Sequence, residues 1–108
     1  MKIYLDDDRT TPIGFERAIS VQQLIDLCRE HKVIDLVSLD NDLGYGQKEG
    51  YDFVKWYVND GVREHIIIKS FNIHSQNIVA EMNMIGLLHS AMMHDVIKTG
   101  LVTKYKSH

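Results

Sequence analysis

The sequence predicts an α/β fold built on a small, doubly wound parallel sheet. Three observations carry this prediction. Short apolar runs alternate with segments of helical periodicity, and the apolar runs are continuous, as in strands buried on both faces. The chain has 108 residues, a length typical of one domain. We therefore expect residues 1–108 to form one domain of the flavodoxin-like kind, with helices on both faces of the sheet.

Apolar runs rich in strand-forming residues predict the sheet. Residues 2–6, 34–39 and 66–73 are predicted to be buried strands, and residues 15–19 a short edge strand. Residues 95–108 form either a last strand or a packed tail. The carboxyl ends of these strands should meet at one edge, where sheets of this kind bind ligands.

Segments with apolar residues at helical spacing predict three helices. The first begins after Ser20, with Gln23 in the position of a capping box. Its apolar face ends at Cys28, which we interpret as a core residue and not a nucleophile. The second helix runs from Tyr51 and ends at Gly61. The apolar stripe of the long third helix is expected to contain Ile78, Met82, Ile85, either Leu88 or His89, and Met92.

Composition excludes several classes of protein. The chain has 15 acidic residues against 12 Lys and Arg, a net charge of −3, which argues against a general binder of duplex nucleic acid. Its single cysteine excludes an internal disulfide framework. No apolar run reaches the length of a membrane span, and the N-terminal segment turns acidic too early for a signal peptide. We expect a cytoplasmic protein.

Acidic side chains follow two of the predicted buried strands. Asp6 and Asp7 follow the first, and Asp40 follows the second. Two carboxylates ~4 Å apart repel by about 4 kcal/mol at an effective dielectric near 20, while a whole domain is stable by only about 5–15 kcal/mol. The three groups must spread apart, take up protons or bind a cation. We favour Mg²⁺ or a similar divalent cation, held by Asp6, Asp7 and Asp40.

The other candidate residues suit the handling of a phosphate group. His74 ends the third buried strand and has a pKa range suited to general acid–base catalysis; we expect Asp42 to orient it. The planar guanidinium of Arg9 can bind a phosphate or neutralise the acids. Ser75 and Asn77 can bind the phosphate or cap the helix that follows.

The layout resembles the receiver domains of response regulators. Such domains carry an acidic pair after the first strand and a phosphate-accepting Asp after the third, which Asp6, Asp7 and Asp40 match. They also carry a Lys at the fifth strand, for which this chain offers only a poorly placed counterpart, Lys98. By this resemblance, Asp40 could accept a phosphoryl group.

A closer resemblance is to the cyclic-phosphate processing receiver domains, and it covers roughly residues 1–90. The matching segments are Leu5-Asp-Asp-Asp-Arg9-Thr-Thr-Pro12, Ser38-Leu-Asp-Asn-Asp-Leu-Gly44, His74-Ser-Gln-Asn77 and Asn83-Met84. The chain departs from the family pattern at Ile78, where members often have Pro, and at Ala80-Glu81, where they have Gly-Arg. Phe15 stands in place of a Trp. The departure at Ala80-Glu81 removes the Arg, and with it a basic contact for the phosphate.

The resemblance implies a function that agrees with the residues. We expect a metal-dependent phosphoesterase acting on cyclic phosphates of nucleotides or RNA ends. Its catalytic residues would be Asp40, Asp42 and His74, and its phosphate would be bound by Arg9, Ser75 and Asn77. Two alternatives remain open: a phospho-accepting signalling module, and a non-catalytic binding protein that keeps the acidic pocket as a relic.

Overall fold

The computed structural model describes residues 1–104 and confirms the predicted α/β fold. A parallel sheet contains, in spatial order, β2 (Glu16–Ala18), β1 (Lys2–Leu5), β4 (Leu36–Leu39), β6 (Ser70–Ile73) and β7 (Leu101–Lys104). A separate parallel pair consists of β3 (Val33–Ile34) and β5 (Ile67–Ile68). The helices are α1 (Val21–His31), α2 (Gly50–Trp56) with its π-helical extension η1 (Tyr57–Gly61), and α3 (Ile78–Met93). Of the C-terminal segment, residues 101–104 are therefore a strand, and 105–108 lie outside the described residues.

Two predicted strands are each divided in the structure. Residues 34–39 contribute to both β3 and β4, and residues 66–73 to both β5 and β6. The divisions fall at Asp35 and Lys69, whose backbone N–H groups bond to different neighbours. Asp35 donates to the carbonyl of Met1 at 2.9 Å, whereas Lys69 donates to the last residue of β3 at 2.9 Å. The chain thus passes from the small pair into the main sheet at these two points.

Helix α1 forms as predicted. The hydroxyl of Ser20 accepts from the backbone N–H of Gln23 at 3.1 Å, and the Gln23 side chain accepts from the N–H of Ile19 at 2.9 Å. Its buried face consists of Val21, Leu24, Ile25 and Cys28. Cys28 is fully buried, which confirms it as a core residue, and this burial raises the pKa of its thiol to about 12.

Helix α3 buries Leu88 and half-buries Ile85 and Met92 as predicted, but its buried face is turned away from the other two residues of the predicted stripe. Ile78 and Met82 are 70% and 67% exposed, and the buried residues are Ala80, Met84, Leu88 and Ala91. The helix is apolar around most of its circumference, so periodicity alone does not single out a face. Packing against α2, β6 and β7 decides the matter instead. Within residues 1–104, no helix is both long and apolar enough to cross a membrane.

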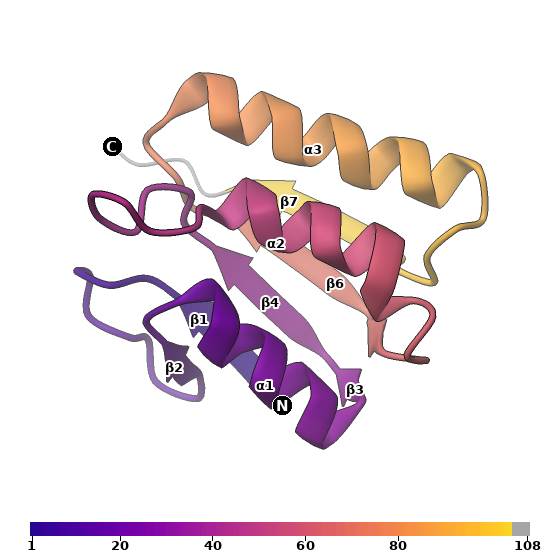
Figure 1. Cartoon of the computed structure of the whole chain (residues 1–108), viewed down its shortest axis with the longest axis horizontal. Coiled ribbons are helices and arrows are strands. Elements are labelled where there is room, and N and C mark those ends of the chain that lie inside the picture. The colour runs from indigo at the N-terminus through magenta and orange to yellow at the C-terminus, as the bar shows by residue number, and fades with distance from the viewer. Residues whose placement is uncertain (105–108) are drawn as a thin grey trace.

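All three helices lie on one side of the main sheet, as Figure 1 shows, so the sheet is more open than we expected from the sequence. Alternate strand residues fill the core beneath the helices: Ile3, Leu5, Val37, Leu39, Phe71 and Ile73. The intervening Tyr4, Ser38 and Asn72 are paired across β1, β4 and β6 and point to the opposite face. The connection from β1 to β2 is a loop containing Pro12 and Gly14, and no helix within residues 1–104 covers that face.

Candidate functional site

Three candidate residues are held at the carboxyl edge of the sheet by backbone hydrogen bonds. Asp6, Asp40 and His74 directly follow β1, β4 and β6. Asp6 N–H donates to the carbonyl of Ala18 at 3.0 Å, Asp40 N–H to that of Leu5 at 3.0 Å, and His74 N–H to the end of β4 at 2.9 Å. The ladder therefore extends one residue beyond each strand, and the three side chains start from fixed positions.

The predicted acidic cluster forms on this edge. Asp6, Asp7 and Asp40 each offer a carboxylate oxygen, and these three oxygens lie within 4.8 Å of one another. They line a cavity of about 490 Å³ together with Asp42 and Arg9. Three carboxylate oxygens at this spacing, lining one cavity, are a donor set that suits a hard divalent cation.

The carboxylates of Asp6 and Asp40 have opposite pKa shifts. Burial opposes the ionisation of Asp6, but the backbone N–H groups of Arg9 and Asp8 and the ring of His74 outweigh it and lower the pKa. The Asp40 carboxylate accepts fewer hydrogen bonds than that of Asp6, its backbone donor being the N–H of Asn41. Its burial, together with the nearby Asp6 charge, raises its pKa to about 6. Without a metal ion, Asp6 is thus firmly ionised, whereas Asp40 takes up a proton in mildly acidic solution.

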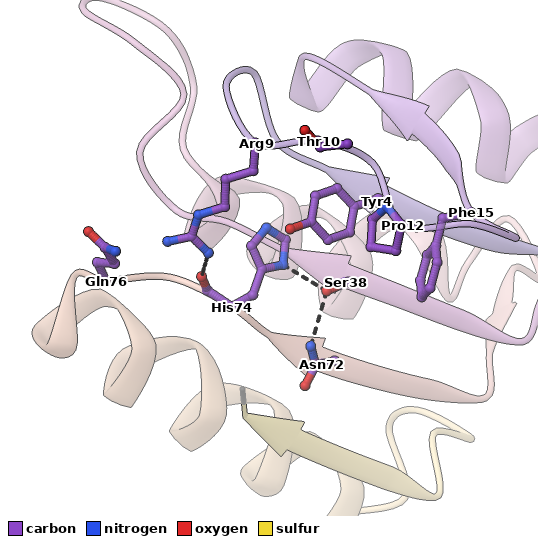
Figure 2. A pocket seen from close by; sticks show the side chains of 9 residues that line it. All are labelled: Tyr4, Arg9, Thr10, Pro12, Phe15, Ser38, Asn72, His74 and Gln76. Atoms are coloured by element: carbon purple, nitrogen blue, oxygen red, sulfur yellow. Dashed lines mark hydrogen bonds between the residues drawn. The ribbon is translucent and has the colours of Figure 1, made fainter. Parts of the chain in front are cut away.

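His74 is held by a chain of hydrogen bonds that crosses the sheet (Figure 2). Its Nε2 lies 3.0 Å from Asp6 Oδ2 and its Nδ1 lies 2.7 Å from Ser38 Oγ. Asn72 Nδ2 donates to Ser38 Oγ at 3.1 Å, and the Tyr4 ring stacks on the imidazole at 4.3 Å. Because Asp6 is ionised, Nε2 carries the proton and Nδ1 accepts from the Ser38 hydroxyl. Burial lowers the pKa of His74, so the ring is neutral at pH 7.

The expectation that Asp42 orients His74 is therefore wrong. Asp42 is exposed at the rim of the acidic cavity, where its Oδ1 accepts from Asn41 Nδ2 at 3.0 Å and faces Asn77 Nδ2 at 3.5 Å. The partner of the imidazole is Asp6, because its carboxylate leaves β1 at the same level as His74 leaves β6. Asp42 instead links the loop after β4 to the start of α3.

Arg9 connects the ends of β1 and β6. Its backbone N–H donates to Asp6 Oδ1 at 3.0 Å, and its Nη1 donates to the carbonyl oxygen of His74 at 2.6 Å. Its Nε lies 3.9 Å from Asp6 Oδ2, so it also compensates part of the buried negative charge. Arg17, on β2, stabilises the loop that follows β1, because its Nη1 donates to the Arg9 carbonyl oxygen at 2.6 Å. The guanidinium borders the acidic cavity, beside the cluster of carboxylates.

Ser75 and Asn77 make local hydrogen bonds at the start of α3. Asn77 is the N-cap, its Oδ1 accepting from Ala80 N–H at 3.1 Å, and Ser75 Oγ accepts from Asn77 N–H at 3.0 Å. The capping alternative is thus confirmed for Asn77, and phosphate binding by either residue stays a prediction. Gln76, between them, lines the acidic cavity and was not predicted. The sequence of residues 74–77 does not indicate which of these three side chains caps the helix and which lines the cavity.

Among the described residues, the Lys that β7 brings to the carboxyl edge is Lys104, and Lys98 is as poorly placed as the sequence indicates. Lys104 ends β7 and pairs in register with Ile73, whereas Lys98 precedes β7 at the other end of the strand. Lys104 Nζ lies 3.6 Å from Glu81 Oε1. The family's Gly-Arg position thus holds a carboxylate here, paired with a Lys from the neighbouring strand.

Gly50 supports the site through its missing side chain. It begins α2 against the backbone of Asp40, where a Cβ would overlap the Asp40 carbonyl oxygen. Its N–H donates to the Asn41 carbonyl at 3.0 Å, and Asn41 Oδ1 accepts from Tyr51 N–H at 3.1 Å. The loop of residues 44–50 therefore ends on a contact that sets the position of Asp40.

Replacing Gly50 with alanine is expected to lower the free energy of unfolding by about 3 kcal/mol, because backbone must move to admit the methyl group. Urea denaturation measures this. Gly86→Ala is the matched control: Gly86 lies on α3 with nothing near its Cβ position, so alanine should leave stability unchanged or raise it by up to about 1 kcal/mol. Equal stabilities of the two variants would contradict the close approach.

Fold and site together define a class of protein. Within the main sheet the strands lie in the order second, first, third, fourth, fifth, the flavodoxin-like order, with an acidic pair after the first strand and an Asp after the third. The chain belongs to the family of cyclic-phosphate processing receiver domains, whose family model matches residues 1–90. Searches of curated proteins and of solved structures returned no match.

Proposed function

We propose that this protein is a metal-assisted phosphoesterase that opens cyclic phosphates of nucleotides or RNA ends. The observation that carries the proposal is the convergence of three carboxylate oxygens within 4.8 Å of one another, beside the guanidinium of Arg9. Family membership supports the substrate class. The ligand is a phosphate-bearing small molecule or an RNA end, and the protein acts in the cytoplasm.

Each side chain has a role in this proposal. Asp6, Asp7 and Asp40 hold Mg²⁺ or a similar cation, which when bound polarises a phosphoryl oxygen or makes its water more acidic. Arg9 binds the phosphate oxygens. Water forms the new bond to phosphorus as the bond from phosphorus to one sugar oxygen breaks. The neutral imidazole of His74 takes a proton of that water at Nδ1 through the Ser38 hydroxyl and returns it to the leaving sugar oxygen.

Hydrolysis of 2′,3′-cyclic nucleotides, measured with and without Mg²⁺, tests the proposal. We expect ring opening to a phosphate monoester that depends on the cation. No reaction with any 2′,3′-cyclic nucleotide, or a rate that is the same in EDTA, would contradict it.

Mg²⁺ or Mn²⁺ is expected to stabilise the protein against thermal unfolding. A cation at one hundred times its dissociation constant adds about 2.7 kcal/mol, and Asp7→Asn should remove most of this gain. A melting scan measures both. Asp26→Asn, which removes one exposed carboxylate on α1, is the control and should keep the gain. Absence of any gain in the wild type would favour a non-catalytic protein with a relic acidic pocket.

A second candidate function is phosphorylation of Asp40, as in response-regulator receivers. One observation favours it: Lys104 ends β7 at the same edge of the sheet as Asp40, where receivers carry their fifth-strand Lys. Beryllofluoride with Mg²⁺, followed by fluorine NMR, tests it. A bound signal that is lost in Asp40→Asn would support phosphorylation, and no bound signal would count against it.

A further inference from the structure

A second cavity, of about 420 Å³, lies beside the acidic one on the open face of the sheet. Its walls are the aromatic rings of Tyr4 and Phe15 and the ring of Pro12, and Ser38 and Asn72 line its polar side (Figure 2). Tyr4, Ser38 and Asn72 are successive members of one cross-strand row, so three strands fix this surface. The cavity falls within the size range of small-molecule sites.

The chemistry of this cavity suits a neutral, planar heterocycle. Phe15 packs edge-on against Tyr4 with centroids 5.9 Å apart, and both are rigid apolar surfaces. Arg9 is the only permanently charged side chain in the lining. An anion would find its charged partner only at Arg9, and an aliphatic group would leave the spare hydrogen-bonding capacity of the cavity unused.

Asn72 keeps hydrogen-bonding capacity for such a ring. Its Nδ2 donates one hydrogen to Ser38, and its Oδ1 accepts once from Thr103 at 2.9 Å. An amide has two donors and a carbonyl oxygen with two lone pairs, so one donor and one acceptor remain. An adjacent donor and acceptor is the pattern with which amide side chains bind the edges of nucleobases.

The two cavities share Arg9 and Gln76. A ligand whose phosphate contacts the Arg9 guanidinium can therefore extend from the acidic cavity into the second one. The arrangement places an anion site and a ring site on either side of one arginine, as a nucleotide requires.

We propose that the cavity bounded by Tyr4, Phe15, Pro12, Ser38 and Asn72 binds the nucleobase of the ligand whose phosphate lies at Arg9. The inference rests on the proposed function and assigns the base of its nucleotide or RNA-end substrate to this cavity. Cyclic phosphates without a base are then poor ligands.

Calorimetry in Mg²⁺ tests the inference with ligands that cannot be ring-opened. The probes are the four nucleoside 3′-monophosphates and glycerol 1-phosphate, which has a phosphate monoester but no base. We expect at least one nucleotide to bind about tenfold more tightly than glycerol 1-phosphate. Phe15→Ala and Phe15→Leu should reduce this preference to within about twofold. Ile13→Ala, in the same loop but fully exposed, is the control and should retain it.

Chemical-shift mapping of the wild-type protein gives a readout that needs no variant. The side-chain amide of Asn72 and the backbone amide of Phe15 should shift with the nucleotide and not with glycerol 1-phosphate. Equal affinities, no nucleotide binding, a preference that survives in Phe15→Leu, or unchanged Asn72 signals would overturn the inference. Failure of the proposed function is seen separately, as no Mg²⁺-dependent opening of either glycerol 1,2-cyclic phosphate or a 2′,3′-cyclic nucleotide.

Discussion

Asp40→Asn is expected to make the metal-free protein more stable while abolishing its proposed activity. The Asp40 carboxylate is partly buried beside Asp6, which raises its pKa to about 6. Asparagine has the same shape and its Oδ1 can still accept from Asn41 N–H, the 2.8 Å bond of the wild type. It carries no charge, so the repulsion disappears. Hydrolysis of 2′,3′-cyclic nucleotides should fall by about 100-fold or more, because a proposed metal ligand is lost.

The stabilisation depends on pH in a defined direction. The pKa of Asp40 is higher in the folded protein, about 6, than its ordinary value of 3.8, so folding favours the protonated form. This contribution to stability is complete below about pH 4 and is lost as pH rises through 6. We therefore expect Asp40→Asn to match the wild type near pH 4. Near pH 8 it should exceed the wild type by about 1–3 kcal/mol, allowing for solvent screening.

Urea denaturation in EDTA at the two pH values measures this difference. Asp8→Asn is the control: Asp8 lies on the same cavity but is exposed, so its substitution should change stability little at either pH. A less stable Asp40→Asn at pH 8, or an equal gain at both values, would contradict the electrostatic account of Asp40.

His74→Ala is expected to lower both stability and activity. The change removes a hydrogen bond to the fully buried Asp6 and the stacking partner of Tyr4. An unsatisfied buried polar group and a lost aromatic pair together correspond to about 2–4 kcal/mol of unfolding free energy. If the imidazole transfers the proton, hydrolysis should fall by about 10²–10⁴-fold under conditions where the variant remains folded.

His89→Ala, at an exposed position on α3, is the control and should preserve both properties. Circular dichroism establishes the folded fraction before rates are compared. Wild-type hydrolysis in folded His74→Ala would assign the proton transfer to another group. Ser38→Ala keeps the His74–Asp6 contact but removes the hydroxyl at Nδ1, so a loss of rate in the folded variant would support the route through the Ser38 hydroxyl.

The acidic cluster was predictable because it depends on local order along the chain. Asp6, Asp7 and Asp40 directly follow apolar runs, and parallel strands bring such positions to one edge whatever the details of packing. The N-cap Asn77 and the buried face of α1 were predictable for a similar reason, since a cap and a narrow apolar stripe are local signals. These features follow from spacing within a few residues.

Residues that act across the sheet could not be placed in this way. Ser38, Asn72 and Tyr4 lie inside strands and converge only through the register of β1, β4 and β6. One signal was present: Ser70 to Ile73 alternate polar and apolar, a pattern typical of a sheet with one solvated face. The partner of His74 likewise depended on the distance between strand ends, which favours Asp6 over Asp42.

The sequence by itself determined the α/β class, the strands that form the site and the acids at their ends. Periodicity and strand-end chemistry are local, and they survive any arrangement of the helices. The tertiary structure alone decided that all three helices of residues 1–104 share one face, that α3 buries Ala80 and Met84 instead of Ile78 and Met82, and that Lys104 reaches the edge. These features depend on contacts between segments that are distant in the sequence. The local sequence pattern allows more than one buried face, and side-chain packing and strand register decide which of them is buried.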